Sequence, residues 1–150
     1  KQVDFEAEIA VVIGRRARRV SPGRALDHVL GYTLMNDVTA RDLQRSDGQW
    51  TRAKGFDGFA PLGPWIVPGL SPGNIGVEAW VNGKRRQKSS TRRLIFDIPA
   101  LVAFVSGVMT LEPGDVISTG TPSGVGPLRP GDRVEIRSPQ IGRLMNRVSR

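Results

Sequence analysis

Residues 4–14 read DFEAEIAVVIG, and no other stretch of the chain constrains the fold as strongly. Apolar residues alternate with the others, which predicts a strand over residues 4–13. Side chains two positions apart on a strand share a face, so Glu6 and Glu8 point the same way. The opposite face carries the apolar residues suited to burial, namely Phe5, Ile9, Val11 and Ile13.

Two carboxylates aimed together toward a core repel each other and lose hydration unless a cation lies between them. A hard divalent cation is the simplest such partner, because it prefers carboxylate oxygens. Asp37, in the stretch NDVTARD over residues 36–42, supplies a third carboxylate. The sequence therefore predicts an oxygen-rich metal site at Glu6, Glu8 and Asp37, with room for water and substrate.

Length and composition indicate one globular domain. The chain has 150 residues, of which 39% are hydrophobic, and this is enough to bury a core. No run approaches the roughly 20 apolar residues that span a bilayer, and no signal-peptide pattern is present. The absence of cysteine excludes disulfides and thiolate metal sites. We expect a soluble, cytoplasmic protein without a membrane partner, whose true N-terminus lies upstream of Lys1.

The net charge of +8 makes nucleic acid a candidate partner. The arginines form small groups, as at residues 15–19, but aromatic side chains are not interleaved with them as in a base-stacking surface. Nucleic acid is therefore not the expected partner, since an anionic small molecule or a partner subunit explains the arginines as well. The alternative from another class is a non-catalytic, basic β-domain that binds nucleic acid or protein.

The remaining pattern predicts many short strands and few helices. Ser21 as N-cap, Pro22 at the first helical position and Gly31 at the end predict a short helix over 22–30. Further strands are predicted at residues 32–38, 62–67, 77–81, 84–88, 134–136 and 144–148, with a hairpin turn at 82–83. A helix over 99–106, a helical turn over 40–44 and a loop over 45–60 complete the pattern. These elements indicate a β-rich α+β domain with a rolled or sandwiched mixed sheet, because the strands do not alternate with long helices.

Two further features could carry chemistry. The glycine-rich loop over 118–126 offers backbone N–H groups and hydroxyls that could hold a carboxylate, or it is a plain turn. Lys54 lies between aromatic residues, where it is either a surface lysine or a group whose pKa desolvation lowers for work on a carbonyl or enolate.

The residues around Asp37 have two readings. Arg41 and Gln44 follow it closely and could share its surroundings, or Arg41 could instead pair with Asp42 or Asp57. The single histidine, His28, is expected to be an exposed or capping residue, since no Ser-His-Asp arrangement can be built around it.

Taken together, these stretches resemble the fumarylacetoacetate hydrolase family, and in particular its C-terminal catalytic domain. The resemblance covers essentially the whole chain and rests on ordered motifs at residues 4–14, 31–44, 54–64, 81–87, 91–96 and 114–126. Several ordered motifs are far more specific than any single one. The resemblance implies one β-roll or β-sandwich-like catalytic domain over 1–150, with a few short helices and usually assembled as a homodimer.

The resemblance also implies a site. Family members bind Mg²⁺, Mn²⁺ or Ca²⁺ through the carboxylates that match Glu6, Glu8 and Asp37. Catalytic positions match Lys54 and Thr121, and substrate-binding positions match Arg41, Gln44, Gly120 and Thr121. The implied substrates are 2-oxo or 2,4-dioxo acids such as acylpyruvates, often products of aromatic-ring cleavage.

The reaction expected first is hydrolysis of a C–C bond through a metal-chelated enolate. Many hydrolytic members take a histidine base from a segment ahead of the strand that matches residues 4–14, and His28 does not match that position. Either an upstream segment holds the base, or the protein is an isomerase or decarboxylase of a 2-hydroxy-diene or 2-oxo-ene diacid in aromatic catabolism.

Overall fold

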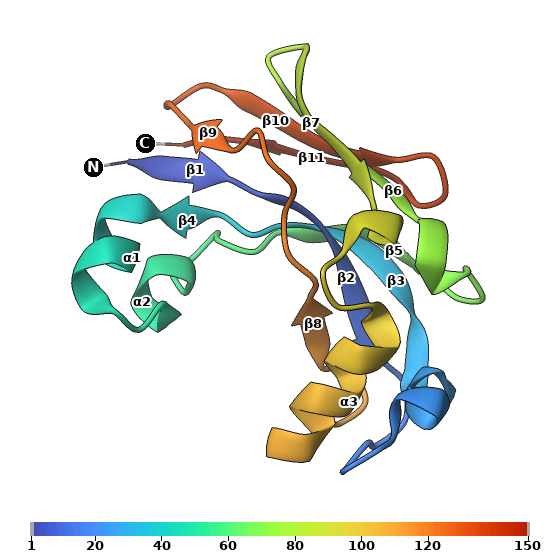
Figure 1. The fold of residues 1–150 in the computed structure, drawn as a ribbon. Coiled ribbons are helices and arrows are strands. Elements are labelled where there is room, and N and C mark those ends of the chain that lie inside the picture. The colour runs from blue at the N-terminus through green and yellow to red at the C-terminus, as the bar shows by residue number, and fades with distance from the viewer. Residues whose placement is uncertain (1, 150) are drawn as a thin grey trace.

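The computed structural model describes residues 2–149 and contains three sheets with short helices beside them (Figure 1). One four-stranded sheet has the order β5-β3-β2-β8, with the bounds Leu62–Val67, Val29–Asn36, Ala7–Ile13 and Val116–Ser118. The second has the order β11-β10-β6-β7, with the bounds Gly142–Arg147, Arg133–Ser138, Gly76–Val81 and Lys84–Ser90. A small sheet joins β4 (Thr39–Ala40), β1 (Val3–Phe5) and β9 (Gly126–Pro127). The predicted β-rich domain is confirmed, although the pairings within these three sheets are antiparallel and not mixed in direction.

The apolar core lies between the two four-stranded sheets. The first sheet contributes Ile9, Val11 and Ile13 of β2, and the second contributes Val134 and Ile136 of β10, all at most 2% exposed. Burial of each such side chain contributes about 1.5–3 kcal/mol, so this layer is a main source of stability. The alternation predicted for the start of the chain is confirmed only in part, because its apolar face lies in this core but every residue of β2, Glu8 included, is buried.

The predicted strand over residues 4–13 is in fact two strands that belong to different sheets. β1 continues into β2 through Glu6, and the neighbouring β3 continues into β4 through Asp37 and Val38. The Glu6 N–H donates to Asn36 Oδ1 at 2.9 Å instead of to a strand, and the Asp37 N–H donates to the Glu6 carbonyl oxygen at 2.9 Å. Two adjacent strands therefore leave one sheet at the same level, and each has a carboxylate at its break.

The first predicted helix differs from the structure. Residues Pro22–His28 form a 3₁₀ helix, η1, and the Ser21 side chain makes no capping hydrogen bond. Gly31 does not end this helix but lies within β3, which begins at Val29 and pairs with β2. A Cβ at Gly31 would lie 2.6 Å from the carbonyl oxygen of Val67, so the glycine serves close strand packing.

The stretch predicted as a loop over 45–60 contains helical structure. Helix α1 spans Arg41–Asp47 and helix α2 spans Thr51–Lys54. Ala53 of α2 is the only buried residue of these two helices. The sequence gives only a weak helical signal for α1 and α2, because each helix has a very small apolar face. These two helices nevertheless position a site, because α1 begins with Arg41 and α2 ends with Lys54.

The other elements confirm the sequence-based predictions. Asn82 and Gly83 have φ values of +50° and +78° and turn β6 into β7, and β10 pairs with β11 as the final hairpin. Helix α3 spans Ile98–Val108 and is capped by Asp97, whose side chain accepts from the Ala100 N–H. The short 3₁₀ helices η2 and η3 span Pro72–Asn74 and Thr91–Arg93. Within residues 2–149, no helix has the length and apolar character needed to cross a membrane.

Candidate active site

Three buried carboxylates meet where the two strands change sheet. Each of Glu6, Glu8 and Asp37 offers one oxygen atom, and these atoms lie within 4.8 Å of one another. The residues are 7%, 2% and 8% exposed, respectively. The sequence therefore correctly predicted that these side chains come together, although only Glu8 lies within a strand.

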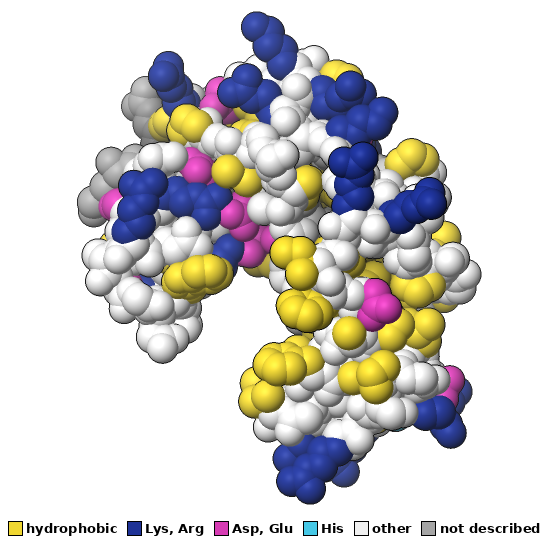
Figure 2. Space-filling model, in the orientation of Figure 1, with side chains coloured by type: hydrophobic (Ala, Val, Ile, Leu, Met, Phe, Trp, Pro, Cys, Tyr) yellow, Lys and Arg dark blue, Asp and Glu magenta, His cyan; other side chains and the backbone are white. Residues whose placement is uncertain are grey.

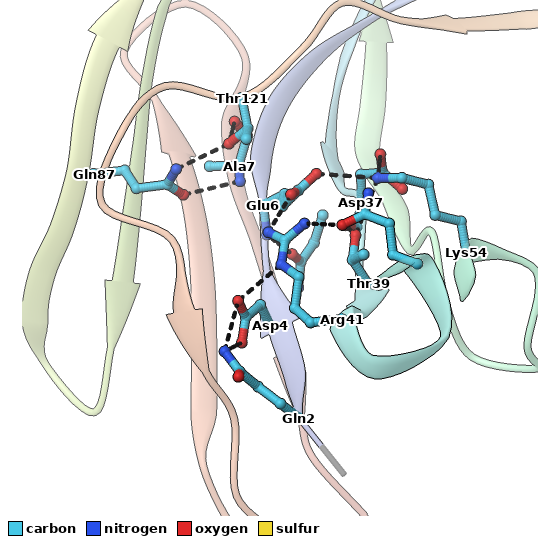
Figure 3. A network of polar contacts seen from close by, with 12 residues as sticks. Gln2, Asp4, Glu6, Ala7, Asp37, Thr39, Arg41, Lys54, Gln87 and Thr121 are labelled. Carbon is cyan, nitrogen blue, oxygen red and sulfur yellow. Dashed lines mark hydrogen bonds and ion pairs between the residues drawn. The ribbon is translucent and has the colours of Figure 1, made fainter. Parts of the chain in front are cut away.

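Lys54 is held directly against this cluster (Figure 3). Its Nζ donates to Glu6 Oε2 at 3.1 Å, to Thr39 Oγ1 at 3.0 Å and to Asp37 Oδ2. Burial lowers the pKa of Lys54, but the hydrogen bonds and charges of Asp37 and Glu6 outweigh it and raise the pKa above its ordinary value. The lowered pKa that the sequence left open as one alternative is therefore not found, and Lys54 is a cation held at the site by its acidic partners.

Arg41 is the second cation at the cluster, and its acidic partners are Asp4 and Glu6. Its guanidinium donates to Asp4 Oδ2 at 2.9 Å, to Gln44 Oε1 at 2.9 Å and to Glu6 Oε1. Burial opposes its charge, but the hydrogen bonds with Asp4 and Glu6 raise its pKa overall. The alternative pairing with Asp42 or Asp57 is therefore not the one formed, and Gln44 orients Arg41.

Glu8 has a different environment from the other two carboxylates. Its Oε2 accepts from the Gly120 N–H at 2.8 Å and from the Ser118 hydroxyl. Gly120 has a φ of +100°, and this left-handed conformation belongs to the loop that presents its N–H. Burial is the main cause that raises the pKa of Glu8, and the nearby charges of Asp37 and Glu6 add to it. In the described part of the chain, no lysine or arginine nitrogen lies within 4.0 Å of Glu8.

The glycine-rich loop thus holds a carboxylate of the protein itself, and Gln87 fastens it to β2. The buried Gln87 side chain accepts from the Ala7 N–H at 3.0 Å and donates to Thr121 Oγ1 at 2.9 Å and to the Pro122 carbonyl oxygen at 2.6 Å. The Thr121 hydroxyl donates to the Ala7 carbonyl oxygen at 3.0 Å. The Thr121 proton is therefore committed to the backbone, and the hydroxyl can offer a ligand only its remaining lone pair.

Sequence reasoning did not single out Asp4, Thr39, Ser118 or Gln87 as site residues. Gln87 gave a usable signal, because it is the one uncharged residue in the basic run KRRQK over residues 84–88. Asp4 belongs to the first sequence motif, but its ion pair with Arg41 depends on the pairing of β1 with β4. Arg41 directly follows β4 as the first residue of α1. His28 is the last residue of η1, and its Nδ1 lies 2.9 Å from the Arg16 carbonyl oxygen.

The donor set fits a hard divalent cation. Four carboxylates, Asp4, Glu6, Glu8 and Asp37, meet two cations, Arg41 and Lys54, which leaves two negative charges without a partner in this cluster. All the candidate ligand atoms are oxygens, and they lie within 4.8 Å of one another, close enough for one ion with metal–oxygen distances of about 2.0–2.6 Å to contact all three. Glu6, Glu8 and Asp37 would hold the ion, with Ser118 and Gly120 orienting Glu8.

Glu6, Glu8 and Asp37 thus form a buried cluster of oxygen ligands next to two fixed cations, Arg41 and Lys54, at the joint of a β-rich domain. The family model for the C-terminal domain of fumarylacetoacetate (FAA) hydrolase matches residues 1–149. The chain therefore belongs to the fumarylacetoacetate hydrolase family, as the sequence motifs predicted.

Relatives with named activities are isomerases as well as hydrolases. The chain is 55% identical to a structure of 5-carboxymethyl-2-hydroxymuconate delta-isomerase from Mycobacterium smegmatis, with a TM-score of 0.98 over 100% of this chain and 60% of that one. It is 46% identical to oxaloacetate tautomerase YisK of Bacillus subtilis, over 98% of this chain and 52% of that protein. A structure of maleylpyruvate hydrolase from Sphingobium is 40% identical, with a TM-score of 0.91 over 99% of this chain and 55% of that one.

The chain spans 57% to 68% of the length of the first curated relatives that it matches.

Proposed function

We propose that this chain is the catalytic domain of a divalent-metal-dependent enzyme that converts 2-oxo acids through an enolate. The observation that carries the proposal is the buried cluster of Glu6, Glu8 and Asp37, against which Lys54 is held as a permanent cation. Mg²⁺ is the proposed ion, with Mn²⁺ or Ca²⁺ as substitutes of the same ligand preference.

The proposed substrate class follows from the coordination positions of the metal ion that the three carboxylates would leave open. Three carboxylates fill half of an octahedral shell, and the adjacent carboxylate and ketone oxygens of a 2-oxo acid can fill two further positions. When bound, a divalent cation would withdraw electrons from the ketone and so acidify the neighbouring carbon.

The residues of the chain would stabilise the charge that develops next to this carbon. Lys54 presents a raised-pKa ammonium group beside Glu6 and Asp37, where an enolate oxygen would also lie. Arg41 holds Glu6 in place through its ion pair, and Asp4 and Gln44 fix Arg41 in turn. Gly120 and Ser118 hold Glu8, so substrate binding need not reorganise the site.

Isomerisation is the reaction that we place first, and C–C hydrolysis is the second candidate. This order reverses the prediction from sequence alone, because the more similar of the relatives named above are described as an isomerase and a tautomerase. Hydrolysis stays a candidate because the maleylpyruvate hydrolase structure retains the whole fold at 40% identity. Decarboxylation produces an enolate of the same kind, because the electrons of the broken C–C bond pass to the ketone oxygen, and it is named in a relative from Salmonella dublin described as a bifunctional isomerase/decarboxylase.

The three reactions differ in their products, and this difference is the test. The Mn²⁺-loaded protein is incubated with oxaloacetate and, separately, with an acylpyruvate, and the products are followed by ultraviolet absorbance and mass spectrometry. Isomerisation conserves the mass, hydrolysis adds water and yields two acids, and decarboxylation releases CO₂. The proposal fails if no substrate is converted, or if Glu8→Gln and Lys54→Ala convert it as fast as the unchanged protein.

A cytoplasmic location and a homodimeric assembly complete the proposal. Both were predicted from the sequence and its family resemblance, and the relatives are described as enzymes that act on small metabolites. Sedimentation of the purified chain, whose mass is 16.3 kDa, measures the assembly directly.

A further inference from the structure

All three N–H donors of the Lys54 ammonium group are engaged by the protein itself. A lysine carries three such donors. Those of Lys54 go to Glu6 Oε2 at 3.1 Å, to Thr39 Oγ1 at 3.0 Å and to Asp37 Oδ2. Glu6 and Asp37 are also two of the three carboxylates that are proposed to hold a divalent cation. Lys54 can therefore donate to a substrate only after it gives up one of these partners.

Of the two cations that bind Glu6, Lys54 is the one that is free to move. Arg41 binds the other Glu6 oxygen, Oε1, and it is held separately by Asp4 Oδ2 and Gln44 Oε1, both at 2.9 Å. The Lys54 ammonium lies at the end of a flexible four-carbon stem, and its two charged partners are the carboxylates that a metal ion would use. A divalent cation at these carboxylates would repel the ammonium, because the positive charges would lie close together at a site shielded from water.

Trp50 lies within reach of the Lys54 side chain. The two residues are four positions apart on α2, and the Lys54 N–H donates to the Trp50 carbonyl oxygen at 3.1 Å. Side chains at this spacing lie on the same side of a helix. The Lys54 Nζ is 6.0 Å from the centroid of the Trp50 ring, which is the outer limit of a cation–π contact. A small movement of the ammonium away from the carboxylates can therefore bring it onto the ring.

The Trp50 ring is also available for such a contact. It is 56% exposed, although it is a large apolar side chain. Figure 2 shows hydrophobic surface on the lobe that carries α1 and α2, next to the acidic and basic side chains in the hollow. Asp47, at the end of α1, could compete for a displaced ammonium, but it is already paired with Arg52. The ring is thus a suitable place for a cation that has lost its carboxylates.

We propose that Trp50 is a positioning residue that receives the Lys54 ammonium when Glu6 and Asp37 bind a divalent cation. The inference rests on the proposed function, because it requires the metal site. A ring face attracts the charge of an ammonium group without occupying all of its N–H donors. Lys54 therefore neutralises the carboxylates in the empty site, and it gains free donors for the substrate once the site is filled.

A double-mutant cycle on Mn²⁺ affinity tests this role without any substrate. Electron paramagnetic resonance of free Mn²⁺ measures the dissociation constants of the unchanged chain, Trp50→Leu, Lys54→Met and the double variant. With Lys54 present, Trp50→Leu should weaken Mn²⁺ binding by about two- to fivefold, because the displaced ammonium loses its contact with the ring. In the Lys54→Met background, the same change should have no effect, since no ammonium is displaced.

Two further variants assign the effect to the aromatic ring of Trp50. Trp50→Phe should keep most of the Mn²⁺ affinity, because phenylalanine also offers an aromatic face. Trp65→Leu is the matched control, because Trp65 is 63% exposed but belongs to β5. It should leave the Mn²⁺ affinity unchanged.

The movement of Lys54 can be followed by nuclear magnetic resonance with Mg²⁺, which is diamagnetic. The indole N–H signal of Trp50 is assigned by its loss in Trp50→Phe. Addition of Mg²⁺ should shift this signal in the unchanged chain, because a positive charge approaches the ring. The shift should be much smaller in Lys54→Met, where the metal ion binds but no ammonium moves.

The outcomes separate this inference from the proposed function. If Mn²⁺ binds but Trp50→Leu has no effect, or has the same effect with and without Lys54, the role of Trp50 is wrong and the proposed function stands. Equal shifts of the Trp50 signal in the unchanged chain and in Lys54→Met would also overturn this role. If the unchanged chain does not bind Mn²⁺, the proposed function falls and the inference falls with it.

Discussion

At the scale of single residues, the charge balance of the site depends on Lys54. Its Nζ forms ion pairs with both Glu6 and Asp37, so its single positive charge is shared by two of the carboxylates that a metal ion would also use. Its raised pKa keeps it charged at neutral pH. Its contribution is therefore expected to lie in stabilising negative charge on the substrate, while the carboxylates provide the affinity for the ion.

The variant Lys54→Met separates these two contributions. We expect turnover of the substrate identified by product analysis to fall by about 10²- to 10³-fold, since a preorganised cation at the developing charge is lost. The affinity for Mn²⁺ should stay the same or increase, because a competing positive charge has been removed. Lys84→Met, at the exposed first residue of β7, is the control and should change neither quantity. Loss of Mn²⁺ binding in Lys54→Met would contradict this division of roles.

The residues of the site could be predicted only in part, and the reason is physical. Glu6, Glu8 and Asp37 were recognised because like charges on one strand face demand a cation. Thr39 and Ser118 contact Lys54 and Glu8 through single hydroxyls, and hydroxyls are too common in sequences to be distinguished. Neither alternative considered for Lys54 included a raised pKa, because its two acidic partners lie 48 and 17 positions away in the chain.

At the scale of elements, the loop over residues 118–126 depends on how closely it approaches β7. Gly124 has a φ of +105°, and a Cβ at this position would lie 2.2 Å from the Arg86 carbonyl oxygen. The loop cannot retreat freely, because Gln87, the neighbour of Arg86, holds it through Thr121 and Pro122. Close backbone contact therefore sets the position of the loop relative to Glu8.

We expect Gly124→Ala to destabilise the chain by about 2–4 kcal/mol, since left-handed strain and a backbone clash add together. Gly131→Ala is the matched control, because Gly131 has a similar φ of +92° but open space around its Cβ direction. Gly131→Ala should lower the free energy of unfolding only by the left-handed strain, about 1–2 kcal/mol. Urea unfolding of both variants measures the difference, and equal losses would show that the clash is relieved by movement of the loop.

The elements themselves were predicted best where the signal is local. The turn at Asn82-Gly83, strand β5 and helix α3 were recognised from turn chemistry, alternation and an apolar run. The break at Glu6 could not be predicted, because alternation continues through it and only the side chain of Asn36 diverts its N–H from strand pairing. Helix α2 is only four residues long, so the sequence gives a weak signal for it.

At the scale of the whole molecule, stability toward acid depends on a buried carboxylate far from the site. Glu135 of β10 is 1% exposed and forms ion pairs with Arg133, Arg137 and Arg143. Burial raises its pKa, but the hydrogen bond and charge of Arg137 and the other arginines outweigh it and lower the pKa below 4.5. Arg137 is also held over the Trp80 ring, 4.4 Å from its centroid, which orients it toward the carboxylate.

A lowered pKa in the folded state means that the ionised form of Glu135 stabilises the fold. This contribution is complete above the unfolded-state pKa and is lost as the pH falls through the folded-state pKa. We expect Glu135→Gln to lower the free energy of unfolding at pH 7 by about 1–3 kcal/mol. The difference from the unchanged chain should shrink from about pH 6 to about pH 3. A difference that is constant over this range, measured by thermal or urea unfolding, would contradict the ion-pair account.

The central claim is that Glu6, Glu8 and Asp37 form a divalent-cation site that is completed by a 2-oxo acid or its mimic. The most direct measurement is the binding of Mn²⁺ to the purified chain with and without oxalate, by electron paramagnetic resonance or calorimetry. We predict that Mn²⁺ binds and that oxalate tightens its binding. Glu8→Gln should abolish Mn²⁺ binding and the effect of oxalate, while the variant stays folded because the glutamine side chain can keep the contacts with Ser118 and Gly120. Unchanged Mn²⁺ affinity in Glu8→Gln, or no binding by the unchanged chain, would contradict the claim.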